Sequence, residues 1–319
     1  MQNISPATST SSVSINSVDY KSLSDSNDNY SNKKMNVNKD IVQGSSQSKP
    51  KYSFVVEKDE NFKSGKKLLI RGKDLIKLNE NSFKANSELF LTSMELSPDR
   101  QSCLDYRLER LPKNINLFKN VRELKLDTND LKELPIQIGE LTRLERLSLS
   151  NNHLKTLPDQ AFSKLVNLKS LHLSNNEFEA IPNSVLSLKM LEFLDLTSNS
   201  IKKIDKNISK LQNTLKSLLL YDNMIEDVTQ IQELRNLDSV WIGKNKIKHL
   251  PLSITNIKTL DWKNRYLTLI LDNNPLTEPP LSICRQGFDT IKNWYNEKSK
   301  KEKATTILVD DKNKSKDRK

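Results

Sequence analysis

A repeating pattern of apolar and polar residues runs from residue 121 to residue 276. Each of its seven copies reads apolar, two variable residues, apolar, one, apolar, two, asparagine, one, apolar. The copies begin at Val121, Leu144, Leu168, Leu191, Leu215, Leu237 and Tyr266. Their asparagines follow one another at spacings of 23, 24, 23, 24, 22 and 29 residues. A period in this range predicts a solenoid, in which each repeat packs against its neighbours.

Each copy predicts a short strand, a turn and a return leg. In the copy that begins at Leu144, Leu147 and Leu149 alternate with polar residues, which is the period of a strand with one buried face. Asn152 follows where the chain must turn, and its side chain can bond to backbone groups that the turn leaves unpaired. The return leg begins at Pro158, since proline is tolerated outside a sheet. We expect the asparagines to form a ladder: Asn129, Asn152, Asn176, Asn199, Asn223, Asn245 and Asn274.

Two weaker copies of the strand pattern precede the seven clear ones. Leu68 and Ile70 fit the first copy, and Met94 and Leu96 fit the second. Asp99 stands where the second copy would carry its asparagine. Irregular copies are expected at the end of a solenoid, where a repeat must shield the first layer of the core.

The return legs carry the signal for a known group. Leu134-Pro135 is followed by Ile138 and Leu141, and other copies keep this spacing. Residues 108–297 thereby resemble the intracellular leucine-rich-repeat proteins, the group containing Ras suppressor, Erbin and Scribble. The resemblance implies an α/β solenoid shaped as a curved horseshoe, with one parallel sheet on its concave face. It also implies binding of signalling proteins, small GTPases or phosphatases among them, and no shared chemistry.

The composition of the two ends predicts disorder rather than a packed core. Residues 1–60 are dominated by Ser, Asn, Asp and Lys, and residues 298–319 by Lys and Asp. Such segments bury too little apolar surface to offset the entropy lost on ordering. We therefore expect the repeat domain to occupy residues 61–297 and to end in a capping helix. One apolar face of that helix consists of Phe288, Ile291, Trp294 and Tyr295.

The net charge of +11 is concentrated outside the repeats. Residues 298–319 hold nine Lys or Arg and four Asp or Glu, a net of +5, and residues 1–67 hold ten and seven, a net of +3. The remaining +3 belongs to the repeats, where both signs are mixed. A nucleic-acid-binding protein should show a basic stripe on its folded surface. The distribution therefore argues against a specific nucleic-acid partner.

The sequence predicts a monomeric protein of the cytoplasm, with the nucleus as the other compartment. The start shows no basic region followed by an apolar stretch, so we expect no signal peptide. No run of about 18 apolar residues is present to span a membrane. The two cysteines, Cys103 and Cys284, do not form the clustered disulfide caps that extracellular relatives carry. A reducing compartment fits this usage.

The residues that could carry chemistry are scattered. His153, His172 and His249 fall at three different phases of the repeat, and no two of them stand at metal-ligand spacing. Glu192 and Asp195 share one strand, yet nothing in the pattern places them in a pocket that would raise a pKa. We therefore expect no enzyme, no metal and no cofactor.

The candidate binding site lies on the concave face, where the residue between the two core positions of each strand points outward. In order, these residues are Lys125, Ser148, His172, Asp195, Leu219, Trp241 and Ile270. The first half of the row is polar and the second half is apolar. We expect a protein-binding patch of Phe193, Leu219, Tyr221, Trp241 and Ile270, because large apolar side chains on an exposed sheet mark interaction sites. Cover by the C-terminal segment or a neighbouring loop is the alternative.

A second feature lies beside this patch. About six extra residues enter the last repeat near residues 261–266, and insertions within repeats often serve binding. A tolerated insertion without a role is an equal alternative.

These observations favour a non-catalytic scaffold or adaptor that holds a protein partner on its concave face. The alternative is a regulatory subunit that targets a phosphatase or modulates a small GTPase. A weaker third possibility is contact with nucleic acid through the basic C-terminal segment, which would fall steeply with salt.

Overall fold

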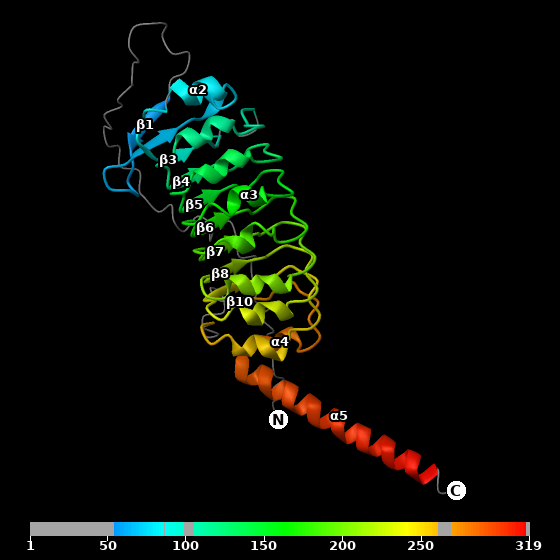
Figure 1. The fold of residues 1–319 in the computed structure, drawn as a ribbon. Helices are drawn as coiled ribbons and strands as arrows, with labels where there is room; N and C mark the ends of the chain where they lie inside the picture. The colour runs from blue at the N-terminus through cyan, green and yellow to red at the C-terminus, as the bar shows by residue number, and fades with distance from the viewer. Residues whose placement is uncertain (1–53, 86, 99–104, 261–268, 317–319) are drawn as a thin grey trace, which may run out of the picture. The chain divides into compact units, whose positions relative to one another are not determined.

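The computed structural model describes residues 54–85, 87–98, 105–260 and 269–316. Ten strands form a single sheet, and their order in the sheet is their order in the sequence. The strands are β1 Val55–Lys58, β2 Lys66–Leu69, β3 Leu91–Glu95, β4 Glu123–Lys125, β5 Arg146–Ser148, β6 Ser170–His172, β7 Phe193–Asp195, β8 Ser217–Leu219, β9 Ser239–Trp241 and β10 Leu269–Ile270. From β2 to β10 every neighbouring pair is parallel. Figure 1 shows these strands stacked one repeat after another.

Short helical segments make up the return legs. The 3-10 segments are η1 Gly72–Asp74, η2 Lys113–Leu117, η3 Ile136–Glu140, η4 Val185–Ser187, η5 Lys206–Leu211, η6 Thr229–Glu233 and η7 Leu252–Asn256. The α-helices are α2 Glu80–Ala85, α3 Asp159–Phe162, α4 Leu281–Cys284 and α5 Phe288–Lys316. Several begin directly after a proline, whose fixed φ and missing N–H suit the first turn of a helix. These prolines are Pro112, Pro135, Pro158, Pro251 and Pro280.

The core is built from rows of apolar side chains, one from each repeat. Leu147 lies between Leu124 and Leu171 in the strand register, and all three are fully buried. The row extends backward through Met94 to Leu68, which are also fully buried. The two weak copies are therefore true repeats, and the predicted solenoid with one parallel sheet is confirmed.

The asparagine of each repeat bonds to backbone groups of two repeats. Asn152 donates from Nδ2 to the carbonyl of Leu149 in its own repeat and to that of Leu126 in the preceding repeat, both at 3.0 Å. Its Oδ1 accepts from the amide of Leu131 at 3.1 Å. The same three contacts recur from Asn129 to Asn274. Each asparagine thus satisfies buried polar groups that the turn would leave without partners.

The residue before each ladder asparagine adopts a left-handed conformation. The φ values lie between 50° and 62°. The residues concerned are Thr128, Asn151, Asn175, Ser198, Asp222, Lys244 and Asn273. This region is disfavoured for residues with a Cβ, although Asn and Asp tolerate it best. The turn therefore carries a local cost that the ladder bonds offset.

The predicted boundary at residue 60 is corrected by strand β1, which pairs with β2 in antiparallel fashion. The hairpin is anchored by Asp59, which is 2% exposed and accepts hydrogen bonds from the hydroxyls of Thr92 and Ser93, both at 2.5 Å. Gly65 returns the chain against β3, where a Cβ would lie 2.1 Å from Oγ1 of Thr92. An antiparallel hairpin at the first edge gives the leading parallel strand a partner.

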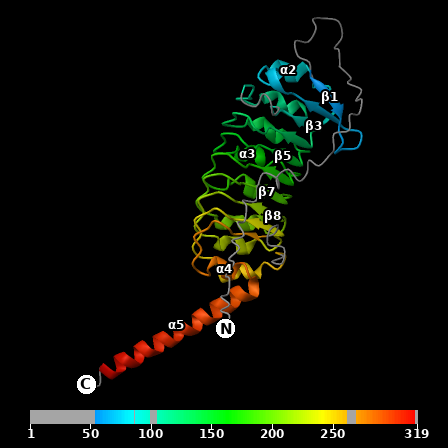
Figure 2. The same cartoon turned by 180° about the vertical axis from the view of Figure 1, so that it is seen from behind.

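The second boundary, at residue 297, is also corrected, because α5 continues to Lys316. Its first turns cap the last repeats: Ile291 is fully buried, and the hydroxyl of Tyr295 donates to the carbonyl of Leu250 at 2.7 Å. Figures 1 and 2 both show α5 starting beside α4. Beyond that cap the helix is built largely from good helix formers, with Lys300 paired to Glu297 at 2.8 Å. No helix in the described ranges is long and apolar enough to cross a membrane.

Replacing Asn199 by Ala tests the ladder. The substitution should lower the free energy of unfolding by about 1–3 kcal/mol, because it leaves turn backbone groups without partners. Urea denaturation followed by circular dichroism measures this. The matched control is Asn213→Ala on the exposed return leg, which should change the midpoint little. Equal effects of the two substitutions would show that the ladder contributes no more than a surface amide.

Two truncations test strand β1. A chain that begins at residue 61 lacks β1 and the carboxylate of Asp59, whereas a chain that begins at residue 54 keeps both. We expect the shorter chain to melt several degrees below the longer one, since it exposes the edge of β2. Differential scanning calorimetry of the two chains makes the comparison. Equal melting temperatures of the two chains would show that β1 does not stabilise the domain and that the predicted boundary at residue 60 is right.

Candidate functional site

The sheet register sets the concave face as an array of aligned side chains. The central row runs through Lys125, Ser148, His172, Asp195, Leu219, Trp241 and Ile270. Each lies one residue after a core position, so it faces away from the core. A second row, two residues earlier in each strand, runs through Glu123, Arg146, Ser170, Phe193, Ser217 and Ser239.

Three of the predicted patch residues lie side by side. Leu219 is opposite Trp241 in the register, and Trp241 is opposite Ile270. Leu219 is 9% exposed and Ile270 is 5% exposed, which is less than an open sheet face would give. Trp241 is half-buried, and so is Tyr221, which follows β8. The accessible part of this patch is therefore mainly aromatic.

Tyr221 owes its place to a glycine that the sequence pattern did not single out. A Cβ on Gly243 would lie 3.0 Å from two carbons of the Tyr221 ring and 2.8 Å from the carbonyl oxygen of Asp272. The ring therefore occupies the space that a side chain at residue 243 would take. A side chain at residue 243 would therefore require a shift of the Asp272 backbone or of the Tyr221 ring.

Phe193 lies apart from the other aromatic residues. It is opposite Ser217 in the register rather than Leu219. Its ring instead packs on the ring of His172, with centroids 4.8 Å apart and an interplanar angle of 34°. His172 also contacts the hydroxyl of Ser170 at 3.0 Å through Nε2. Phe193 therefore marks the boundary between the polar and the apolar halves of the face.

The polar half holds two titratable groups with displaced pKa values. Burial lowers the pKa of His172, although the carboxylates of Asp195 and Asp127 act in the opposite direction. Burial raises the pKa of Asp127, even though its carboxylate accepts from the hydroxyl of Ser148 at 2.5 Å and from the amide of Ser150 at 2.8 Å. Displaced pKa values occur at functional sites and also within structural networks of polar groups.

One rim of the concave face carries a row of alternating charge. The residues are Arg122, Glu145, Lys169, Glu192, Lys216 and Asp238. Glu145 contacts Arg122 at 3.5 Å and Lys169 at 3.4 Å, and Glu192 contacts Lys216 at 2.7 Å. Exposed pairs of this kind contribute little to stability. They give the apolar patch a polar margin on that side.

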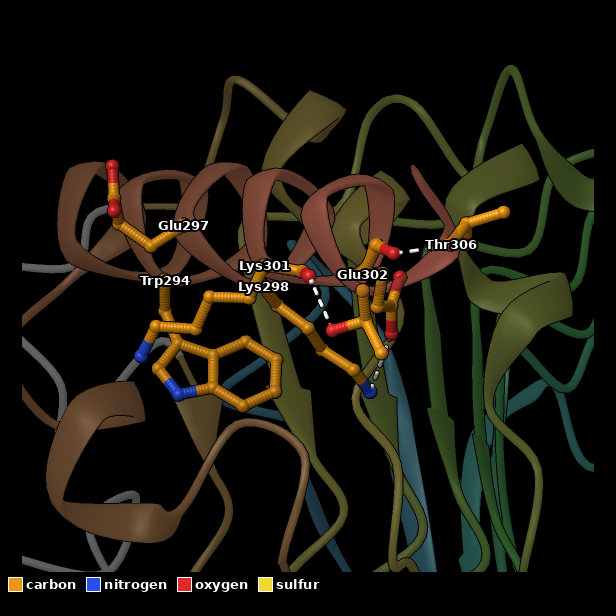
Figure 3. A pocket seen from close by; sticks show the side chains of 7 residues that line it. Trp294, Glu297, Lys298, Lys301, Glu302 and Thr306 are labelled. Atoms are coloured by element: carbon orange, nitrogen blue, oxygen red, sulfur yellow. Dashed lines mark hydrogen bonds and ion pairs between the residues drawn. The ribbon is translucent and has the colours of Figure 1, made fainter. Parts of the chain in front are cut away.

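The other hollows of the described surface are less suited to a partner. Figure 3 shows one beside α5, lined by Trp294, Glu297, Lys298, Lys301, Glu302, Thr305 and Thr306. All of these residues belong to one helix, and Lys298 is already paired with Glu278 at 2.6 Å. A second hollow follows the turns around His153, whose Nδ1 lies 3.0 Å from Glu177. Both hollows are lined largely by charged and polar groups.

The described residues offer few groups suited to metal binding or nucleophilic attack. They contain no group of three or more His, Cys, Asp or Glu that could hold a metal ion. Cys284 is fully buried, and burial raises its thiol pKa to about 11, so the thiol is a poor nucleophile. The three histidines stay apart, and His249 contacts Glu278 at 3.2 Å. Cys103 and the inserted segment near residues 261–266 lie outside the described residues.

Comparisons with known proteins place the repeats. Residues 119–178 and 142–201 match the family model described as leucine rich repeat. A leucine-rich-repeat protein of Leptospira interrogans is similar over 70% of this chain, with 29% identity and a TM-score of 0.52. This chain spans 58% of that protein's chain. None of the curated proteins compared with this sequence matches it.

Two further solved structures show similar repeats. The match to an internalin of Listeria monocytogenes spans 62% of this chain and 66% of that chain, with 20% identity and a TM-score of 0.45. The match to the ectodomain of a plant receptor kinase from Arabidopsis thaliana spans 59% of this chain and 24% of that chain, with 26% identity and a TM-score of 0.46. The resemblance to the intracellular group rests on the sequence pattern of the return legs.

Replacing Asp127 by Asn should stabilise the protein at pH 7. A carboxyl whose pKa is higher in the folded state than the usual 3.8 weakens folding when it ionises. This loss of folding free energy is fully present above the pKa that Asp127 has in the folded state. It disappears as the pH falls to the pKa that Asp127 has in the unfolded state. We therefore expect a higher urea midpoint for Asp127→Asn at pH 7 and a gain that shrinks toward pH 4. Asp222→Asn is the control, because Asp222 pairs with Lys244 at 2.9 Å and should show no gain.

Proposed function

We propose that this leucine-rich-repeat solenoid is a non-catalytic scaffold or adaptor that binds a protein partner on its concave face. Leucine-rich-repeat domains generally mediate protein–protein interaction, and the described part of this chain presents one long sheet suited to that use. The same sheet is continuous from β2 to β10, so a partner can contact several repeats at once.

The aromatic patch is the observation that carries this proposal. Trp241 and Tyr221 lie on the concave side, next to Leu219 and Ile270, and none of them is needed for the buried row of the core. Trp and Tyr are the residues that most often dominate binding energy when a partner covers them. The Tyr221 ring is held against Gly243, so little conformational freedom would be lost on binding.

The surroundings of the patch suit an interface. The rim pair Glu192–Lys216 and the pair Asp222–Lys244 provide charged groups at its margins. An apolar centre with a polar margin is the usual anatomy of a protein interface. Because the strands are held in register by the ladder, the patch is formed before a partner arrives.

The proposal extends to the compartment and to the alternative role. The cytoplasm is supported by Cys284, which is a free and buried thiol. A regulatory subunit for a phosphatase or a small GTPase would use the same face, and the resemblance of the return legs to the intracellular group supports it. The two roles differ in one measurement: a regulatory subunit changes the catalytic rate of its partner, whereas a scaffold leaves that rate unchanged.

Truncation of Trp241 tests the proposal. Once a partner has been isolated with the full chain, Trp241→Ala should weaken its binding by about 2 kcal/mol or more, which is about 30-fold. The melting temperature should change little, because the side chain lies outside the core. Isothermal titration calorimetry measures the affinity.

The matched control is Lys125→Ala, which lies in the same row five strands away. It should change the affinity little. A Trp241→Ala variant that binds normally while Lys125→Ala does not would move the interface to the polar half.

A further inference from the structure

The boundary between the two halves of the concave face combines an aromatic ring with a carboxylate. Phe193 and Asp195 are the first and third residues of β7, so both face the same side of the sheet. His172 lies opposite Asp195 in the register and packs its ring on Phe193. The ring of Phe193 and the carboxylate of Asp195 are therefore neighbours on the same side of β7, and the ring also packs against His172.

Asp195 differs from three acidic residues around the patch that form ion pairs. Glu192, Asp222 and Asp272 each pair with a basic side chain of this chain: Lys216, Lys244 and Arg285. Among the described residues, Asp195 has no such pair. Its carboxylate accepts from the amide of Thr197 at 2.9 Å, which leaves further lone pairs for a donor.

We propose that this boundary binds a cationic side chain of the partner, and that a neighbouring apolar residue of the partner covers Trp241. The inference rests on the proposed function, because it describes chemistry within the same concave interface. Asp195, Leu219 and Trp241 follow one another across three adjacent strands. Two strand spacings are about 10 Å. Residues on one face of an extended segment are spaced by even numbers, so the cationic and apolar residues of the partner are two or four residues apart in an extended segment, about 7 or 13 Å, or two turns apart in a helix.

The geometry favours arginine over lysine. A guanidinium is flat, so it can stack on the Phe193 ring while its N–H groups donate to the Asp195 carboxylate. The ammonium of lysine can pair with the carboxylate but lacks the flat face. The carboxylate of Asp195 disfavours an acidic residue of the partner at this position, and Asp127 adds a second carboxylate on the polar half, where Lys125 contributes the opposite charge.

His172 makes the subsite sensitive to pH. The charged groups that act on it are Asp195, Asp127, Lys125 and Glu123. Because burial lowers its pKa, the imidazole is neutral at pH 7 and does not compete for the carboxylate. Protonation at lower pH adds a positive charge beside the subsite. Binding of a cationic side chain should therefore weaken as the pH falls.

A peptide selection with the full chain tests this inference. Randomised heptapeptides displayed on phage are selected on the immobilised protein at pH 7.5. We expect the selected peptides to be enriched in arginine, and less so in lysine, together with an aromatic or aliphatic residue. Synthetic copies of these peptides should bind Asp195→Asn about tenfold more weakly. They should also bind Trp241→Ala more weakly, and their affinity for the wild-type protein should fall as the pH is lowered from 7.5.

Asp205→Asn is the matched control, because this exposed carboxylate lies on a return leg at the start of η5, and its loss should leave peptide affinity nearly unchanged. Selected peptides that are neutral or acidic, yet still depend on Trp241, would overturn the cationic subsite and leave the concave interface standing. Basic peptides that ignore both Asp195→Asn and Trp241→Ala would overturn both proposals. If the full chain selects no peptide but a chain that begins at residue 54 does, the face is occupied by residues 1–53, and the assignment to a partner is wrong. Failure of both chains overturns it as well.

Discussion

The amide of one asparagine per repeat is the contact on which the rest of this molecule depends. Each such side chain bonds to carbonyls of its own and the preceding repeat, and accepts from an amide of the preceding repeat. It thereby closes a turn that contains a left-handed residue and ties that turn to the layer before it. A repeat alone could neither bury its leucines nor satisfy this turn. Stacking solves both problems with one side chain.

Fixed register is what turns the concave face into a binding surface. Since Leu124, Leu147 and Leu171 must stay in one buried row, the residues on either side of them are held in rows of their own. These outer positions are not constrained by the core. The chain uses them unevenly, with hydroxyls and charges over β4 to β7 and large apolar groups over β8 to β10.

The parts of the structure that follow from spacing were predictable from the sequence, and the parts that follow from local packing were not. The ladder asparagines and core leucines recur at a fixed period, so strands, turns and sheet order follow from them. Strand β1 does not carry the repeat pattern, so the pattern could not predict it. Its hairpin with β2 is anchored by hydrogen bonds from Thr92 and Ser93 to Asp59. Helix α5 continues beyond its cap through a segment rich in Lys, and such a composition is also typical of a disordered segment.

The candidate site shows the same division. The central row of the concave face could be read from the strand pattern, including Trp241 beside Leu219. The stacking of Phe193 on His172 could not, because it depends on which neighbour a ring leans toward. The support of Tyr221 by Gly243 was also beyond the pattern, since it depends on a missing side chain one strand away. The burial of Leu219 and Ile270 could not be predicted from the strand pattern either, since that pattern places both on the concave face.

The row of alternating charge along the rim limits how many repeats can be added to this solenoid at a time. From Arg122 to Asp238 the sign changes at every repeat, and the first four asparagine spacings alternate between 23 and 24 residues. Duplicating a single repeat would place two like charges on adjacent strands, about 4.8 Å apart. Duplicating two consecutive repeats would preserve both alternations. The heritable module of this stretch is therefore a pair of repeats, 47 residues long, as the sum of 23 and 24.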